Sequence, residues 1–361
     1  YLVLSDIHGN LAALEAVLEA HGVTTGLTLS PHLVRVEVRV RLRGKPIRRQ
    51  RLEPHLERLA PFNDLTFFET ITAAAFLVFA EAGIDVAVLE AGMGGTWDAT
   101  RLAGSAIAGI TNVGSDHAHW LGGELVDRAR DKGAALEAAD RAVIGADLPS
   151  ALVTSLGAPH AVSAADLVDV AALGEGRIRI GWDDHELEIP APLVGAHQIG
   201  NLQLALALSR CAVLEGLMPE LDPEALTRGL ATVRWSGRLS THRIMGRTVV
   251  VDGAHNVEGA EALAAHLATW PTKPHLLFSC LADKDVGAMA EHLIPSVGEV
   301  AVCPLADERA MPVERIGAAF PGAFRAPTLT AALNRLPDPV VAAGSLRLAG
   351  ALLELAEQGV E

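Results

Sequence analysis

Short apolar runs alternate with helical patterns through the first part of the chain. The apolar runs predict strands at residues 1–4, 26–29, 85–89 and 107–111. Between them, apolar residues at helical spacing predict helices at residues 11–21, 68–82 and 125–138. These strands are apolar almost throughout, which is typical of a parallel sheet covered on both faces, where ligands collect beyond the carboxyl ends of the strands. The pattern therefore predicts an α/β domain.

Two segments break this rhythm. Residues 34–42 alternate Val or Leu with Arg and Glu, which predicts a half-exposed strand, and Gly44-Lys45-Pro46 predicts the turn after it. Residues 177–190 alternate Ile with charged residues, which predicts an antiparallel hairpin, and a long helix follows through Leu214.

A second βα series begins near residue 248. Its strands are predicted at residues 249–251, 275–278, 300–302 and 340–342. We place the domain boundary near Ser240, which gives a first domain of residues 1–240 and a smaller, doubly wound second domain of residues 241–361.

Composition narrows the class of protein. The chain has 361 residues, 50% of them hydrophobic, and a formal net charge of -15, which argues against a nucleic-acid-binding surface. Cys211, Cys280 and Cys303 are widely separated, so they predict core thiols in a reducing cytoplasm. No apolar run is long enough to span a membrane, and we expect no membrane partner.

Polar residues follow several of the predicted strands. They are Ser30, Glu90 with Gly92, Gly94 and Gly95 behind it, Asp98, Asp116-His117, and Asp252-Gly253-Ala254-His255-Asn256. A carboxylate, an imidazole and a hydroxyl at one sheet edge could hold Mg²⁺, and the glycines would let the backbone approach a ligand closely. Each residue alone also has a plain structural interpretation: Glu90 as a satisfied strand end, His117 as a packing histidine and Asp252 as a helix cap.

Taken together and in order, the motifs resemble the folylpolyglutamate/dihydrofolate synthases of the Mur ligase superfamily. The resemblance runs from about Gly22 to the C-terminal helix. It rests on SPHL, TFFE, LEAGMGG with DAT, DH followed by LG, Lys132, GAHQ with Asn201, SGRL, DGAHN, ADKD and GSL.

The resemblance implies a fold, cofactors and substrates. It implies a Mur-ligase-like ATP-binding domain over residues 1–240, with a parallel sheet, and a Rossmann-like glutamate-ligase domain over residues 241–361. It also implies a cytoplasmic monomer that uses ATP and Mg²⁺ to join L-glutamate to folate or dihydropteroate through an acyl phosphate.

Site residues are implied in the same way. Ser30, Glu90 and His117 would bind Mg²⁺. Lys132 would be the carbamylated lysine of the family. The resemblance assigns Asn201, Arg238 and Asp252 to ATP, with His255 beside the nucleotide, and Lys132, Arg238 and His255 would serve catalysis. The pterin-site positions are Thr66, Phe67, Phe68, Glu69, Trp97, Asp98 and Ala99.

The N-terminus departs from the family. Where the family has a GTNGKGS-like phosphate loop, this chain reads Ser5-Asp6-Ile7-His8-Gly9-Asn10, with Gly9 at the position of the loop Ser and Ile7 at that of the Lys. Neither side chain can replace the original. The chain also lacks the family's segment upstream of the loop and an initiator Met, so we expect a processed or truncated start.

The replacement resembles the first motif of calcineurin-like metallophosphoesterases, SDIHGN, in which an Asp and a His bind one of two metals. The further GD, GNH and GH-x-H segments of such enzymes do not occur downstream, so Asp6 and His8 form an incomplete set. Three interpretations of the function remain: an ATP-dependent ligase impaired by the loss of the loop, a non-catalytic nucleotide or folate binder, and a metallophosphoesterase.

Overall fold

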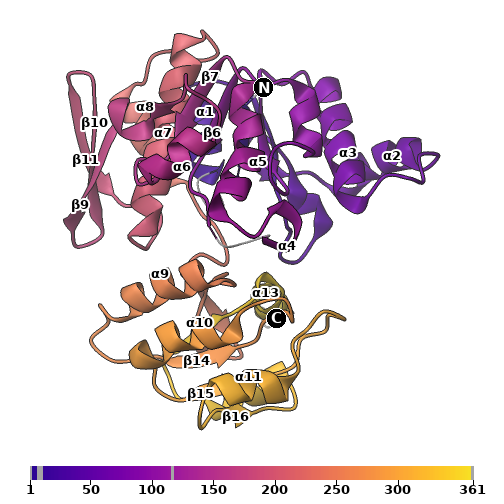
Figure 1. Cartoon of the computed structure of the whole chain (residues 1–361), viewed down its shortest axis with the longest axis vertical. Coiled ribbons are helices and arrows are strands. Elements are labelled where there is room, and N and C mark those ends of the chain that lie inside the picture. Colours follow the sequence, from indigo (N-terminus) through magenta and orange to yellow (C-terminus); the bar gives the residue numbers. More distant parts are fainter. Residues whose placement is uncertain (1, 6–10, 115–117, 359–361) are drawn as a thin grey trace. The chain divides into compact units, whose positions relative to one another are not determined.

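The computed structural model describes residues 2–5, 11–114 and 118–358. The chain forms two compact units (Figure 1). Unit 1 comprises Tyr1–Leu193 and His197–Arg234, and unit 2 comprises Val194–Ala196 and Trp235–Glu361. The division after Arg234 lies six residues before Ser240, in the segment where the helical pattern of the sequence ends.

An eight-stranded sheet forms the centre of unit 1, in the order β4-β3-β2-β5-β1-β6-β7-β8. Six neighbouring strands, from β2 to β8, are parallel, which confirms the predicted parallel sheet. The strands are β1 (Leu2–Ser5), β2 (Thr25–Thr28), β3 (Val40–Leu42), β4 (Lys45–Pro46), β5 (Val86–Ala91), β6 (Ile107–Ile110), β7 (Arg141–Ile144) and β8 (Val162–Ser163).

Helices cover both faces of this sheet. One face carries α1, α7 and α8, and the other carries α3 and α5 (Figure 1). The helices of unit 1 are α1 (Leu11–Ala20), α2 (Arg49–Leu59), α3 (Phe67–Ala82), α4 (Ala118–Leu121), α5 (Leu125–Glu137), α6 (Ser150–Ser155), α7 (His197–Leu214) and α8 (Pro223–Ala231). The predicted helices within residues 11–21, 68–82 and 125–138 are confirmed. None of the helices described in either unit is long and apolar enough to cross a membrane.

The segment predicted as one strand at residues 34–42 is different. A short 3₁₀ helix occupies Val36–Arg39, and only Val40–Leu42 forms a strand. The Val38 N–H donates to the Arg35 carbonyl within this turn, and the Leu29 N–H donates to Arg39 O. The predicted turn is also displaced, because Lys45 and Pro46 form β4 and the chain reverses at Arg43-Gly44.

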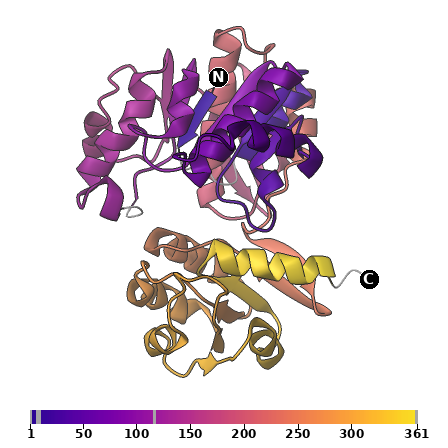
Figure 2. The same ribbon diagram turned by 90° about the vertical axis from the view of Figure 1, so that its right-hand side faces the viewer.

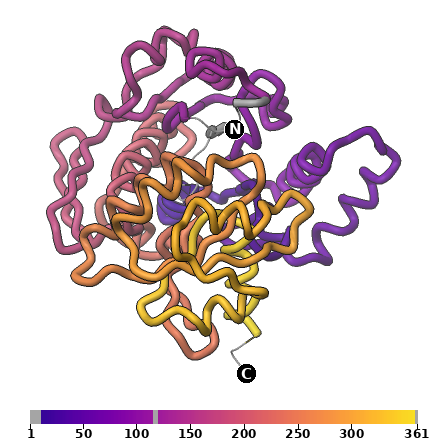
Figure 3. The backbone as a smooth tube through the Cα atoms, turned by 60° about the horizontal axis from the view of Figure 1, so that its bottom comes forward, coloured from indigo at the N-terminus to yellow at the C-terminus, as the bar shows by residue number. Residues whose placement is uncertain are grey.

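A second extension follows this hairpin. The helix α2 was not predicted, because it contains Pro54 and carries few apolar residues, and it packs against α3. Figure 3 shows α2 and its connection to α3 extending from unit 1.

A separate three-stranded antiparallel sheet consists of β9 (Asp169–Gly174), β10 (Arg177–Trp182) and β11 (His185–Pro190). Its β10–β11 pair confirms the hairpin predicted at residues 177–190.

Unit 2 contains a six-stranded sheet in the order β12-β13-β17-β14-β15-β16. Only β12 (Ser240–Ile244) is antiparallel to its neighbour; the others are β13 (Arg247–Val251), β14 (His275–Phe278), β15 (Val300–Val302), β16 (Phe324–Arg325) and β17 (Val340–Ala343). All four strands predicted for this series are confirmed.

The helices of unit 2 pack on both faces of its sheet. They are α9 (Val257–Leu267), α10 (Val286–Leu293), α11 (Val313–Ala319), α12 (Leu329–Arg335) and α13 (Leu346–Gln358). Alternate strand residues such as Leu276 and Phe278 share a core with α9, α10 and α11. The helix α13 instead contacts β12 and β17, as Figure 2 shows for the long yellow helix.

Candidate functional site

The carboxyl edge of the main sheet brings Ser30 and Glu90 together. Glu90 lies in β5 and its side chain is only 1% exposed. Ser30 comes two residues after β2, the neighbouring strand, and its backbone N–H donates to Glu90 Oε2 at 2.6 Å. An acidic side chain is rarely this buried without partners, so this arrangement marks the carboxyl edge as a candidate site.

A glycine-rich loop follows β5 and is folded by Asp98. The N–H groups of Gly92 and Met93 donate to Asp98 Oδ2 at 2.7 and 3.0 Å. The Thr100 N–H and hydroxyl donate to Asp98 Oδ1 at 2.9 and 2.6 Å. Both oxygens of this sequence-predicted pterin-site residue therefore serve the loop itself. Its neighbour Ala99 begins the 3₁₀ helix Ala99–Ala103.

The same loop packs closely on α5. The Gly95 N–H donates to Asp131 Oδ1 at 2.9 Å, and the Thr96 hydroxyl donates to the Asp131 carbonyl at 3.4 Å. A Cβ atom on Gly95 would lie 2.7 Å from the Lys132 carbonyl oxygen, so only glycine permits this approach. Asp131 was not among the predicted site residues, although it precedes one of them.

Lys132 is buried in α5, with 3% of its surface exposed. Burial lowers the pKa of the Lys132 ammonium group to about 8. At neutral pH an amine with this pKa is neutral about a tenth of the time, far more often than a lysine in water. Lys132 therefore differs chemically from a surface lysine.

Arg128 holds the chain on both sides of the segment that carries His117. It is 4% exposed and lies one helical turn before Lys132. Its Nε donates to the Gly114 carbonyl at 2.9 Å, and its Nη1 donates to the carbonyls of Gly122 and Gly123 at 2.7 and 3.1 Å. This role could not be predicted from the sequence, since partners that are backbone carbonyls leave no mark in the pattern of residue types.

The predicted pterin-site positions surround the start of α3 and the glycine-rich loop. The rings of Phe67 and Trp97 are 56% and 92% exposed, whereas Phe68 packs on the loop: a Cβ atom on Gly92 would lie 2.6 Å from its ring. Thr66 and Glu69 form the N-terminal capping box of α3. The hydroxyl and N–H of Thr66 both donate to Glu69 Oε2, and they lower the pKa of that carboxyl group.

The remaining nucleotide-site candidates are divided between the units. Asn201 lies in α7 of unit 1, where its Nδ2 donates to Gln198 Oε1 at 3.4 Å. In unit 2 Asp252 follows β13 and is 6% exposed. Its Oδ2 accepts from the Leu239 N–H at 2.9 Å, and its Oδ1 accepts from the Ala254 N–H at 2.8 Å.

Arg238 and His255 flank the turn that Asp252 begins. The Gly253 N–H donates to the Gly237 carbonyl at 2.7 Å, and a Cβ atom on Gly253 would lie 2.9 Å from Arg238 Nη1. His255 Nδ1 is 2.8 Å from the Gly253 carbonyl oxygen, an arrangement in which it donates. The turn leads into α9, so unit 2 groups three of the predicted residues beside a helix N-terminus, where anions are favoured.

The donor chemistry of Ser30 and Glu90 suits a hard divalent cation such as Mg²⁺, which prefers oxygen ligands. The third predicted ligand, His117, lies outside the described residues, as do Asp6, His8 and the rest of residues 6–10. Among the residues that the structure describes, no three His, Cys, Asp or Glu side chains form a group that could hold a metal ion.

Comparison with known proteins identifies relatives for both units. Residues 237–356 match the family model "Mur ligase, glutamate ligase domain". A "Dihydrofolate synthase/folylpolyglutamate synthase" from Mycobacterium tuberculosis is 33% identical, over 92% of this chain and 75% of the relative. A "Probable bifunctional folylpolyglutamate synthase/dihydropteroate synthase" from Haloferax volcanii is 34% identical, over 92% of this chain, which spans only 43% of that longer relative.

Solved structures are similar across nearly the whole chain. The Mycobacterium tuberculosis folylpolyglutamate synthase complexed with ADP and AMPPCP has a TM-score of 0.88 and 29% identity, covering 100% of this chain and 91% of that one. A bifunctional folylpolyglutamate synthase/dihydrofolate synthase from Yersinia pestis with Mn, AMPPNP and L-glutamate bound has a TM-score of 0.84 and 25% identity. It covers 98% of this chain and 88% of that chain.

Proposed function

The chain belongs to the folylpolyglutamate/dihydrofolate synthase family, and from that premise we propose that it is an ATP-dependent ligase that joins L-glutamate to folate or dihydropteroate. The observation that carries the proposal is the buried Glu90 carboxylate, held beside Ser30 at the carboxyl edge of the parallel sheet. Relatives with the same fold bind ADP, AMPPNP and L-glutamate, according to their descriptions.

The proposed reaction has two steps. A carboxylate oxygen of the folate attacks the γ-phosphorus of ATP, the bond to the β-phosphate oxygen breaks, and ADP leaves. The amine of glutamate then attacks the acyl carbon, loses a proton and displaces inorganic phosphate, so that an amide forms. Because phosphoryl transfer depends mainly on positioning and on neutralising charge, the protein needs cations and N–H donors more than a covalent nucleophile.

We propose Ser30, Glu90 and His117 as the Mg²⁺ ligands of unit 1. The fit rests on the buried carboxylate and the adjoining serine. When bound, Mg²⁺ would neutralise charge on the phosphate oxygens. The chain's own contribution is to fix the two oxygen donors: the Ser30 N–H holds one Glu90 oxygen, and the Asp98 hydrogen bonds hold the loop that follows Glu90.

Lys132 is proposed as the carbamylated lysine. Carbamylation requires a neutral amine, which attacks CO₂ and releases a proton to leave a carbamate. The lowered pKa of Lys132 supports the proposal, because it raises the neutral fraction. Asp131 and Gly95 place the backbone of the glycine-rich loop against this part of α5.

For the nucleotide we propose Asn201 from unit 1 and Arg238, Asp252 and His255 from unit 2. The turn at Asp252 supports the assignment. The Ala254 N–H donates to Asp252 Oδ1 and holds the turn, and the N-terminus of α9, which follows, favours an anion. Arg238 would supply positive charge to the transferring phosphates.

For the pterin we propose stacking on Phe67 and Trp97, whose rings are exposed. Phe68, Thr66, Glu69, Asp98 and Ala99 would shape the site. The internal hydrogen bonds of Glu69 and Asp98 favour a role in holding α3 and the loop in place.

The missing phosphate loop is the reason to propose reduced activity. Gly9 and Ile7 stand where the family has its loop Ser and Lys, so the transferring phosphates lose two donors. A non-catalytic nucleotide or folate binder remains the second candidate, favoured by the same departure. We further propose a cytoplasmic monomer; the three buried, unpaired cysteines support a reducing compartment.

The test is an assay of labelled glutamate incorporated into folate and into dihydropteroate, with ADP release measured in parallel. We expect slow incorporation that requires ATP and is abolished by Glu90→Gln. Nucleotide binding with no ADP release or incorporation at any enzyme concentration would instead establish the non-catalytic binder.

A further inference from the structure

We propose that unit 1 carries a second binding site, for a small polyanion, in a pocket at the amino-terminal edge of the main sheet. The pocket has a volume of about 420 Å³. Its lining combines three cationic and three aliphatic residues: Arg43, Lys45, Arg51, Leu42, Ala82 and Ile84. They come from the β3–β4 hairpin, the first turn of α2 and the end of α3.

The charge of this region is opposite to that of the chain. Nine of the 29 lysines and arginines lie within residues 35–58, together with only three acidic residues, whereas the whole chain carries a formal charge of -15. Charges within roughly 10 Å dominate the local potential at ordinary salt concentrations. The pocket therefore attracts anions although the chain as a whole repels them.

Two of the three cations have no internal partner. Neither the Lys45 ammonium nor the Arg51 guanidinium forms a hydrogen bond or ion pair with any other residue that the structure describes. Arg43 has Asp85 nearby, but the Asp85 carboxylate already accepts from the N–H and hydroxyl of Thr24. These hydrogen bonds keep Asp85 ionised, so that it offsets part of the Arg43 charge, and the charges of Lys45 and Arg51 account for the remaining positive potential of the pocket.

The backbone that presents Arg43 and Lys45 is fixed. Arg43 and Gly44 form a two-residue turn in which both have positive φ, 51° and 73°. Such turns favour Asn and Gly, so an arginine at the first position is conformationally unfavourable. The turn is held by the Arg43 N–H, which donates to Thr25 O at 2.9 Å, and by Arg41, which donates to Gly44 O at 2.5 Å.

This pocket is separate from the proposed ligase site. The strand β3 runs antiparallel to β2 with Leu42 opposite Gly26, so the hairpin turn lies at the amino end of β2, whereas Ser30 follows its carboxyl end. The helix α3 also separates the two sites. Thr66, a proposed pterin-site residue, caps its first turn, whereas Ala82, which lines the pocket, is its last residue. Its 16 residues span about 24 Å.

The lining indicates the chemistry of the ligand. Arginine side chains present paired N–H donors that match phosphate and carboxylate oxygens, and lysine adds a further donor. Three such groups suit a ligand with two or more phosphate or carboxylate groups. Leu42, Ala82 and Ile84 add three aliphatic residues to the lining.

Calorimetric titration of the intact chain tests the site. The probes are sodium tripolyphosphate and citrate, each added at low ionic strength with saturating ADP, so that the proposed nucleotide site is filled. The variant R43Q/K45Q/R51Q removes three charges from the pocket. The control R177Q/R228Q/R335Q removes three charges from exposed arginines elsewhere, on β10, α8 and α12.

We expect at least a tenfold loss of affinity in the pocket variant and less than a twofold change in the control. The probe that binds more tightly identifies phosphate or carboxylate as the preferred group. The double variant K45Q/R51Q leaves the Arg43 turn intact and should lose at least threefold, which decides the question if the triple variant does not fold. Equal losses in the pocket variant and the control, unchanged affinity in the double variant, or no binding of either probe would overturn the proposal.

Discussion

Glu90 is the residue on which the proposed metal site depends. Removing its carboxylate in Glu90→Ala should weaken binding of the Mg²⁺-nucleotide complex at least tenfold, because the buried oxygen donor disappears. Glu90→Gln keeps an acceptor for the Ser30 N–H and should show the same loss. Asp6→Ala should change the affinity much less, since the sequence supplies no further phosphoesterase ligands. A titration in which Asp6→Ala has the equal or larger effect would revive the phosphoesterase interpretation.

Glu15 predicts a pH dependence of stability. It lies in α1, is 2% exposed and contacts Arg41 Nη2 at 3.1 Å. Desolvation raises its pKa from 4.5 to about 7 despite the arginine. Between these values the folded state binds more protons than the unfolded state, so the stabilisation present below pH 4.5 is lost as the pH rises to 7.

The variant Glu15→Gln should therefore gain stability relative to the parent as the pH increases. A shift of this size corresponds to about 3 kcal/mol between pH 4 and pH 8. Urea denaturation of both proteins at several pH values measures the difference in the free energy of unfolding. A difference that stays constant, or that moves in the opposite direction, would show that folding does not raise the pKa of Glu15.

For single residues, the sequence patterns predicted which side chains stand at strand ends better than they predicted which contacts those side chains make. Ser30 and Glu90 could be placed at one edge because each stands at the end of a strand in a parallel sheet. Arg128 and Asp131 were missed, since their partners are backbone groups up to 36 residues away in the sequence. Asp98 stays a predicted pterin-site residue, and the hydrogen bonds by which its carboxylate also holds the loop were not predicted.

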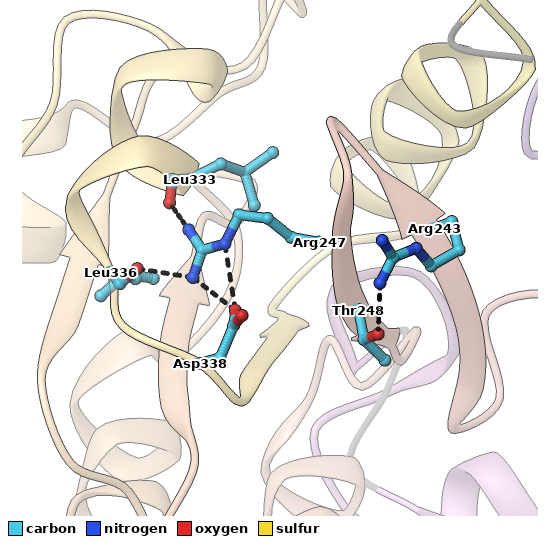
Figure 4. Close-up of polar contacts among 6 residues, drawn as sticks. All are labelled: Arg243, Arg247, Thr248, Leu333, Leu336 and Asp338. Atoms are coloured by element: carbon cyan, nitrogen blue, oxygen red, sulfur yellow. Dashed lines mark hydrogen bonds and ion pairs between the residues drawn. The ribbon is translucent and has the colours of Figure 1, made fainter.

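Among the elements, the β12–β13 hairpin is tied to the end of α12 by one arginine. Figure 4 shows Arg247 donating to the carbonyls of Leu333 and Leu336 and to the Asp338 carboxylate. Its side chain is 19% exposed. Hydrogen bonds from a charged, partly buried group are the stronger kind, so Arg247→Ala should destabilise unit 2 by about 2 kcal/mol.

Arg243 on the facing strand provides the matched control. It makes one hydrogen bond, to the Thr248 hydroxyl at 3.2 Å, in an exposed position (Figure 4). Arg243→Ala should cost less than about 0.5 kcal/mol. Hydrogen exchange of the β12–β13 amides compares the two variants, and equal protection in both would show that Arg247 does not anchor the hairpin.

Element prediction succeeded where burial and periodicity agree. The apolar strands β5 and β14 and the helices α3 and α7 were recognised because their faces are buried in cores built from the same residues that form the pattern. Residues 34–42 were misassigned because alternating Val and Arg also fit a 3₁₀ turn, which is chosen here by a tertiary hydrogen bond from Leu29 to Arg39. The helix α2 packs against α3. It was not predicted because Pro54 lies inside it and proline normally argues against a helix.

For the whole molecule, the proposed site residues are distributed over both units. Unit 1 would supply Ser30, Glu90, Lys132 and Asn201, and unit 2 would supply Arg238, Asp252 and His255. We therefore propose that activity is limited by the segment from Ser5 to Asn10, which stands where the family has its phosphate loop, and not by the retained residues of either unit. Losing one preorganised donor to a transferring phosphate commonly costs about 2.7–4 kcal/mol, a factor of about 10² to 10³ in rate.

The most direct test replaces Ser5 to Asn10 with the family's GTNGKGS-like loop, in register with Gly9 as the loop Ser, and measures ATP-dependent incorporation of labelled glutamate by both proteins. We expect the restored chain to incorporate glutamate at least about 10²-fold faster than the chain as it stands. If the present chain already matches an intact family member, or if the restored chain incorporates no glutamate while binding nucleotide, the account of an impaired ligase is contradicted.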